Sequence, residues 1–191
     1  MRAEFKEQIF NNFLNTREIV INETITDSLI ELVTMQIFNF NRIDDDKESK
    51  EKEYNRNDHP IKIYINSYGG RVYDCLSVIS AIESSKTPIH TIALGKAFSA
   101  GFVILVSGHK RFCQKYSTLC YHQMSDWHGG KLEDLKEELV NSEQIQKRID
   151  NMIISKTLLT QRMLDDSNLH RSDWYIYPEE ALEFKIVDEI L

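Results

Sequence analysis

The chain has 191 residues, of which 41% are hydrophobic and 28% charged, a composition typical of one soluble globular domain with a sizeable core. Its formal net charge of -7 argues against nucleic acid or an anionic membrane surface as the main partner. No apolar run approaches the ~20 residues that span a bilayer, and the N-terminus lacks the apolar segment of a secretory signal. Cys75, Cys113 and Cys120 lie in apolar runs, which favours free buried thiols in a reducing cytoplasm, and no Cys/His spacing indicates a metal site.

The first third of the chain predicts one strand and one helix between polar segments. Residues 1–16 are polar with spaced aromatics, which permits a short amphipathic helix or a frayed terminus. Arg17–Asn22 is typical of a strand, and apolar residues at helical spacing between Leu29 and Phe40 predict an amphipathic helix. Residues 42–59 are almost all charged or amide, so we interpret them as an insertion, either a solvated loop or an exposed helical extension.

Two strand-to-helix turns follow. Ile61–Ile65 alternates like a strand, and after Gly69-Gly70 the apolar residues recur at helical spacing. These glycines fit a tight turn or an oxyanion cradle, but the pattern matches no nucleotide-binding loop. The second turn, Gly95–Gly101, separates the strand-like Pro88–Leu94 from an apolar helix, which places Ser99 at a helix N-terminus. Taken alone, Ser99 fits an ordinary N-cap residue better than a nucleophile.

The second half of the chain continues the alternation. Two short strands are expected at Arg111–Gln114 and Thr118–His122, and a lone histidine at a strand end is more often structural than catalytic. A long helix is expected from Lys131 to Lys156, within a region spanning 123–157. Asp173–Tyr177 looks extended and precedes a helix with Pro178 at its first position. Strands alternating with helices predict a single α/β domain with largely parallel strands.

These residues offer the parts of an acyl-transfer site. A nucleophile, a base, a group that orients the base and oxyanion donors are needed, and carboxyl ends of parallel strands gather such groups in one crevice. Ser99 and His122 supply the first two, but the chain order and the absence of Gly-x-Ser-x-Gly exclude an ordinary α/β hydrolase. The residues alone therefore indicate a serine hydrolase whose orienting carboxylate stays open. The candidates are Asp165, Asp166, Asp173 and Asp188.

Four motifs in order resemble the Clp protease proteolytic subunit (ClpP) family from about residue 17 to the C-terminus. They are Asn66-Ser-Tyr-Gly-Gly-Arg-Val, Gly95-Lys-Ala-Phe-Ser-Ala-Gly, Tyr121-His-Gln, and Asp173 followed by Pro-Glu-Glu-Ala-Leu-Glu-Phe. The resemblance implies a ClpP/crotonase-like α/β fold of repeated ββα units with a protruding handle helix.

The resemblance also implies roles for individual residues. Ser99 would be the nucleophile, His122 the general base and Asp173 the orienting acid, with the backbone N–H groups of Gly70 and Ala100 as oxyanion donors. Residues beside the site that would bind substrate are Gly69, Arg71, Gln123 and Met124.

The implied assembly is a self-compartmentalised serine endopeptidase. Its subunits would form a heptameric ring or a stacked double ring that degrades unfolded polypeptides delivered by an AAA+ unfoldase. The chain itself would need no cofactor or metal, since only the unfoldase uses ATP. Neither nucleic acid nor a membrane is expected as a partner.

Several positions depart from the family pattern. Tyr68 replaces a proline, Phe98 an alanine and Ala100 a methionine, while Ser172 stands where the family has an arginine that couples ring docking to activity. These departures suggest a divergent or phage-encoded member of the family. The alternatives are an inactive structural ring subunit, a phage capsid-maturation protease with the same chemistry, and a crotonase-type acyl-CoA enzyme.

Overall fold

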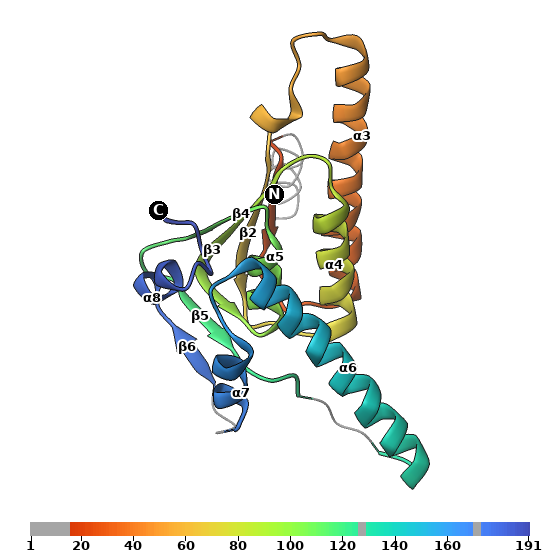
Figure 1. Cartoon of the computed structure of the whole chain (residues 1–191). Helices are drawn as coiled ribbons and strands as arrows, with labels where there is room; N and C mark the ends of the chain where they lie inside the picture. Colours follow the sequence, from red (N-terminus) through yellow and green to blue (C-terminus); the bar gives the residue numbers. More distant parts are fainter. Residues whose placement is uncertain (1–15, 126–128, 170–172) are drawn as a thin grey trace, which may run out of the picture.

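Figure 1 shows a layer of strands with helices packed against it and two helices that extend beyond the layer, α3 and α6. This computed structural model describes residues 16–125, 129–169 and 173–191. All but the last residue of the expected 1–16 segment therefore lies outside the described residues, as do 126–128 of the expected 123–157 region. Within the described residues, no helix is both long and apolar enough to cross a membrane.

The described strands form one sheet, which is parallel except for one pair. Its main path runs in the order β1, β2, β3, β4 and β7, and β5 joins β3 to β6. The strands are β1 (Glu18–Ile21), β2 (Ile61–Ser67), β3 (Ile89–Phe98), β4 (Lys110–Cys113), β5 (Thr118–Tyr121), β6 (Trp174–Ile176) and β7 (Glu189–Ile190). Only β5 and β6 pair antiparallel, so the sheet is parallel-dominated, as predicted.

Strand β3 is longer than the sequence suggested, because it pairs with two different strands along one edge. Residues 90–93 pair with β4, whereas 96–98 pair with β5. The strand therefore continues through Gly95 to Phe98, and the expected turn at 95–101 shrinks to Ser99. This fork in the sheet places the end of β3 directly beside β5, the strand that precedes His122.

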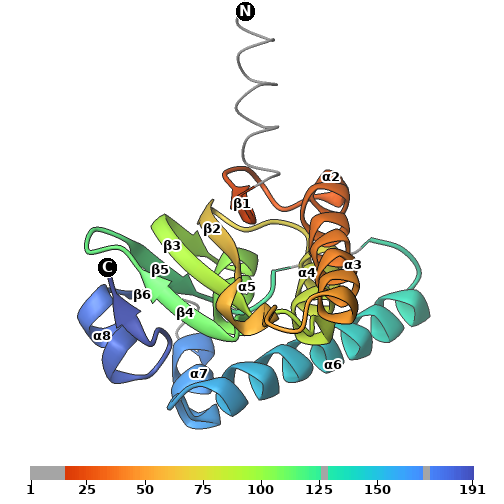
Figure 2. The same ribbon diagram turned by 90° about the horizontal axis from the view of Figure 1, so that it is seen from above.

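The helices cover the sheet in layers (Figure 2). The innermost helix is α5 (Ala100–Ser107), and all eight of its residues are buried. It contacts β2, β3, α4 and α6. The remaining helices are α2 (Asp27–Leu29), the π-helix η1 (Ile30–Thr34), α3 (Met35–Lys50), the 3₁₀ turn η2 (Arg56–Asp58), α4 (Val72–Ser84), α6 (Leu132–Lys156), α7 (Gln161–Leu169) and α8 (Pro178–Glu183). All three cysteines are free and buried, as expected.

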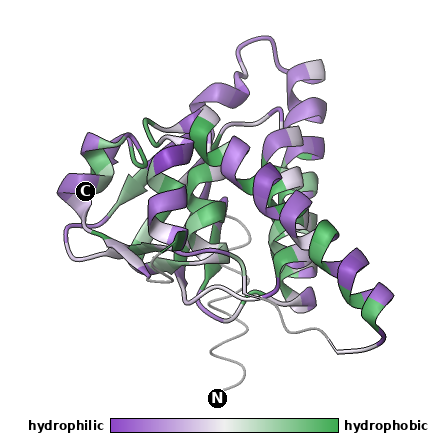
Figure 3. Ribbon diagram, turned by 60° about the horizontal axis from the view of Figure 1, so that its bottom comes forward, coloured by the Kyte–Doolittle hydropathy of each residue, from purple (hydrophilic) through white to green (hydrophobic). Residues whose placement is uncertain are grey.

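Helix α6 belongs partly to the core. Ile145, Ile149 and Ile153 are buried, whereas Leu132 and Leu139 in its first half are exposed. Figure 3 shows hydrophobic and polar residues mixed along this projecting half. The α/β arrangement with a projecting helix is the one that the family resemblance implied.

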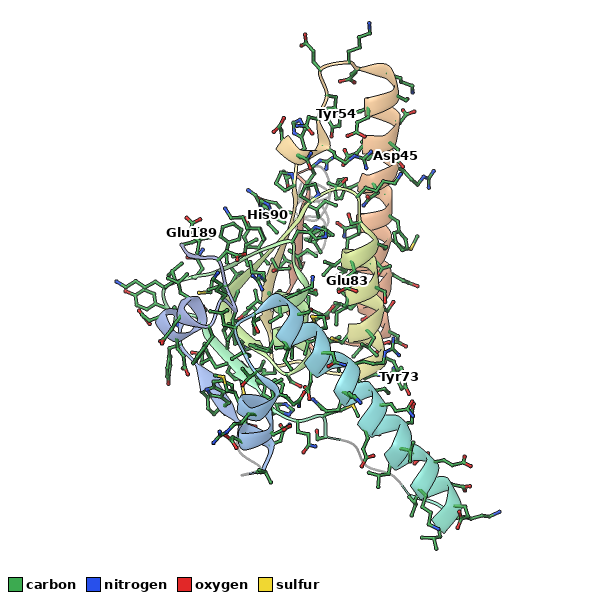
Figure 4. All side chains as sticks on the ribbon, viewed as in Figure 1. Asp45, Tyr54, Tyr73, Glu83, His90 and Glu189 are labelled. Atoms are coloured by element: carbon green, nitrogen blue, oxygen red, sulfur yellow. The ribbon has the colours of Figure 1, made fainter. Side chains whose placement is uncertain are left out.

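The charged segment 42–59 is helical as far as Lys50, where α3 ends, and its charges form specific contacts. Asp44 is fully buried and accepts hydrogen bonds from Arg17 Nη1 (3.0 Å), Thr87 Oγ1 (2.5 Å) and Tyr54 Oη (2.5 Å). Figure 4 shows Tyr54 facing the projecting part of α3. Burial acts to raise the pKa of Asp44, but these hydrogen bonds and the charge of Arg17 outweigh it and hold the pKa below its usual value.

We expect Asp44→Asn to lower the free energy of unfolding at pH 7 by about 3 kcal/mol, because it leaves the half-buried Arg17 without its counter-charge. The pKa of Asp44 is depressed in the folded state, so its contribution is present above the unfolded value of 3.8 and is lost at lower pH. Urea unfolding at fixed protomer concentration should therefore show the two proteins converging below about pH 4.

The exposed Asp46, which pairs with Lys50 on the same helix, provides the control, and Asp46→Asn should change little. A difference between wild type and Asp44→Asn that persists unchanged at pH 2 would contradict the ion-pair explanation.

Candidate active site

Ser99 alone makes the turn from β3 into α5, and its backbone is unusual for a residue with a side chain. Its φ of 54° and ψ of -122° lie outside the regions that L-residues ordinarily adopt. The turn is held from both sides. Ser99 N–H donates to Cys120 O on β5 (2.9 Å), and Val103 N–H donates to Ser99 O (3.1 Å). The buried helix that follows thus fixes Ser99 at a strained strand-to-helix corner.

The second turn, Gly69-Gly70, touches the first. Gly69 has φ +102°, and a Cβ placed on it would lie 2.7 Å from Ser99 Cβ and 2.8 Å from Phe98 O. Gly70 forms a parallel bridge in which Ile25 N–H donates to Gly69 O (2.9 Å) and Arg71 N–H donates to Ile25 O (2.8 Å). In such a bridge the N–H of the middle residue, Gly70, points away from the partner strand.

A cavity of ≈ 460 Å³ lies where the two turns meet. Ser99 and His122 both line it, as do Gly70 and Ala100. Ala100 is the first residue of α5, so its N–H has no acceptor within the helix. The other lining residues are Arg71, Val72, Tyr73, Cys75, Val103, Tyr121, Met124, Ser125, Gln146 and Ile149. Figure 4 shows Tyr73 at the N-terminal end of α4, beside α6.

The predicted substrate-binding residues divide into two groups. Arg71 and Met124 line the cavity, whereas Gly69 and Gln123 do not. Gly69 lies behind Ser99, and Gln123 is exposed, with its carbonyl oxygen 2.6 Å from His122 Nδ1. The imidazole of His122 is thus turned toward its neighbour's backbone.

Asp173 lies outside the cavity wall and directly precedes β6, the strand that pairs with β5. Strands β5 and β6 are antiparallel, with Tyr121 opposite Trp174. One further step along both strands brings His122 opposite Asp173. The Asp173 carboxylate is exposed, and its Oδ2 accepts a hydrogen bond from Tyr175 Oη (3.1 Å).

The other three carboxylate candidates have partners elsewhere. Asp165 accepts from Gln161 Nε2 (2.9 Å), and Asp166 pairs with Arg162 (3.8 Å), both within α7. Asp188 pairs with Arg111 Nη2 (2.9 Å) beside β4. Of the four aspartates left open by the sequence, Asp173 is therefore the one placed beside the strand of His122.

Comparison with known families decides the wider assignment. The family model described as Clp protease matches residues 1–191 of the chain. The chain belongs to the Clp protease family. Clp proteases are in general serine peptidases of the ClpP type, and they generally form oligomeric rings that work with unfoldases.

In this Clp protease, a buried polar network that sequence reasoning missed supports the segment after His122. Gln146 Oε1 accepts from Met124 N–H (2.8 Å), and Gln146 Nε2 donates to Asp150 Oδ1 (2.8 Å). The same carboxylate oxygen accepts from Tyr121 Oη (2.9 Å). Burial, together with the charge of Asp150, raises the pKa of Tyr121, so the phenol stays protonated and donates.

A signal for this network exists in the sequence. Gln146 and Asp150 are four residues apart, beside the buried positions Ile145, Ile149 and Ile153. Polar residues that interrupt an otherwise core-facing helical stripe often belong to a buried network.

Cys75 is a further potential nucleophile in the cavity wall, and its surroundings disfavour that role. Burial raises the pKa of its thiol to about 12, and its Sγ lies 3.4 Å from Ala100 O. A thiol must lose its proton to attack a carbonyl, so Cys75 is inert at neutral pH. It contributes apolar surface to the cavity instead.

Proposed function

We propose that this chain is the catalytic subunit of a serine endopeptidase, with Ser99 as nucleophile, His122 as general base and Asp173 as the acid that orients His122. One observation carries the proposal: Ser99 in its strained turn, His122, and the residues Gly70 and Ala100 with their proposed oxyanion N–H groups all line one cavity. A strained turn that exposes a serine beside unpaired amides is a recurrent arrangement for acyl transfer.

In the proposed mechanism, Ser99 Oγ attacks a peptide carbonyl while His122 takes its proton. The N–H groups of Gly70 and Ala100 hold the oxygen as it becomes negative. His122 then gives the proton to the leaving amine, and water releases the acyl-enzyme by the same steps in reverse. In the structure His122 Nδ1 contacts Gln123 O, so the imidazole has to rotate to reach Asp173.

The lining of the cavity favours substrates that carry an apolar side chain next to the bond that is cut. Its wall includes Val72, Val103 and Ile149 together with the inert Cys75. The polar Gln146 adds little, because both ends of its amide are already engaged with Met124 and Asp150. Of the predicted substrate-binding residues, Arg71 and Met124 line the cavity, so an extended substrate would run past these two.

We propose further that the subunits assemble into a heptameric ring or a stacked double ring, and that a cytoplasmic AAA+ unfoldase delivers unfolded polypeptides. Family membership supports this arrangement. So do the exposed Leu132, Leu139 and Val140 on the projecting half of α6, which offer apolar surface to a second copy. The chain itself would use no cofactor, and ATP would be consumed by the unfoldase alone.

Covalent labelling tests the catalytic proposal. We expect a fluorophosphonate to modify the wild-type chain at Ser99, identified by mass spectrometry, and to label His122→Ala at least 100-fold more slowly. Labelling should be measured on the assembled oligomer. A chain that assembles into rings but takes up no label and cleaves no apolar peptide would instead be the inactive structural subunit.

A further inference from the structure

Three aromatic side chains form a row beside the proposed catalytic residues. We call Tyr68, Phe98 and Tyr175 the aromatic row. The ring of Phe98 contacts that of Tyr68 edge to face (5.6 Å between centroids) and that of Tyr175 in the same manner (5.7 Å). Tyr68 and Tyr175 are exposed, at 70% and 48%. The contacts with Phe98 therefore restrict two side chains that would otherwise rotate freely in solvent.

The register of the sheet explains why the row forms. Phe98 on β3 is opposite Cys120 on β5, which in turn is opposite Tyr175 on β6. Paired residues on neighbouring strands share a face, so the rings of Phe98 and Tyr175 meet over the small Cys120. Two members of the row are also direct neighbours of proposed functional residues in the chain. Tyr68 precedes Gly69, and Phe98 precedes Ser99.

Tyr175 connects the row to Asp173. Asp173 directly precedes β6 and is two residues before Tyr175, a spacing at which side chains of an extended segment share a face. The hydroxyl of Tyr175 donates to Asp173 Oδ2 (3.1 Å). This hydrogen bond and the nearby negative charge raise the pKa of Tyr175, so the phenol remains a donor at neutral pH.

Within residues 16–125, 129–169 and 173–191, no hydrogen-bond donor reaches Asp173 Oδ1. Because His122 follows Tyr121, which is opposite Trp174, its imidazole can approach the carboxylate from the neighbouring strand. One oxygen would then be held by Tyr175 while the other receives His122 Nδ1–H.

We propose that Tyr175 is a positioning residue of this peptidase, whose hydroxyl fixes the Asp173 carboxylate for His122 and whose ring is anchored through Phe98 to the Ser99 turn. The inference rests on the proposed function. An exposed aspartate otherwise samples several rotamers, and each productive turnover would require it to adopt the right one. The hydrogen bond from Tyr175 thus holds the exposed Asp173 carboxylate in one orientation.

The substitution Tyr175→Phe tests this role, because it removes the hydroxyl and keeps the ring against Phe98. With an apolar fluorogenic peptide we expect kcat to fall about 10-fold and KM to stay unchanged. Tyr177→Phe is the matched control: Tyr177 is also an exposed tyrosine, two residues further along, and its loss of a hydroxyl should leave kcat unchanged.

A double-mutant cycle separates positioning from a general structural role. If Tyr175 acts through Asp173, adding Tyr175→Phe to Asp173→Asn should cause no further loss of residual turnover, measured with an activated ester. A further 10-fold loss in that background, or an unchanged kcat for Tyr175→Phe alone, would overturn the inference and leave the proposed function intact. A wild-type oligomer that neither hydrolyses the ester nor takes up fluorophosphonate would overturn both.

Discussion

Replacing Ser99 with alanine should lower peptide hydrolysis by at least about 10⁴-fold, because the proposed mechanism forms its acyl-enzyme on Ser99 Oγ, the hydroxyl that His122 is proposed to activate. Cys75 cannot substitute, since burial raises the pKa of its thiol to about 12. Hydrolysis of an apolar fluorogenic peptide by wild type and Ser99→Ala, purified in parallel and compared at equal protomer concentration, provides the measurement.

The backbone at Ser99 makes a second variant informative. Its φ of 54° is unfavourable for alanine as for serine, but glycine adopts such angles freely. We therefore expect Ser99→Gly to be as inactive as Ser99→Ala but about 1 kcal/mol more stable in urea unfolding. Equal stability of the two variants would contradict the idea that the corner is strained, and substantial hydrolysis by either would remove Ser99 from the mechanism.

Gly69→Ala should sharply reduce activity although Ser99, His122 and Asp173 are all retained, because it displaces Ser99 from its turn. The new methyl group would lie 2.7 Å from Ser99 Cβ and 3.0 Å from Ala100 N, a separation at which atoms have to move. It would also sit at φ +102°, where side chains are strained. We expect at least a 10³-fold loss of hydrolysis and a loss of about 2–4 kcal/mol in the free energy of unfolding.

A glycine at the start of the helical region provides the control. A Cβ on Gly130 would meet Asp134 at 3.7 Å, an ordinary contact, so Gly130→Ala should retain full activity and stability. Wild-type turnover by Gly69→Ala would show that the two turns do not depend on one another.

The fold was predictable to the extent that each element carries its own periodicity. The alternation in Ile61–Ile65 and the helical spacing after Gly70 correspond to β2 and α4. The extent of β3 was not predictable, because it depends on pairing with β4 and then β5, strands that come later in the chain. Leu32, one of the apolar residues between Leu29 and Phe40 whose spacing predicted an amphipathic helix, is 39% exposed and lies in the π-helix η1, whose spacing differs from the helical period used for the prediction.

The candidate site follows the same division. Ser99, Gly70 and His122 each lie just after a strand, so local sequence could mark them. Local sequence left four aspartates equivalent, because only the antiparallel pairing of β5 and β6 brings Asp173 near His122. Gln146 and Asp150 were missed for a similar reason: they reach the site through α6, more than 20 residues beyond His122 in the chain.

The position of β6 near the end of the chain has a consequence for synthesis on the ribosome. Ser99, His122 and the glycine turn belong to elements made early, whereas Asp173 comes with the last strand but one and reaches β5 only after residues 174–176 have emerged to pair with it. On the proposed assignment, a nascent or prematurely terminated chain would carry a nucleophile without its complete relay. The order of elements would thus delay cleavage until the segment that carries Asp173 and β6 has been made.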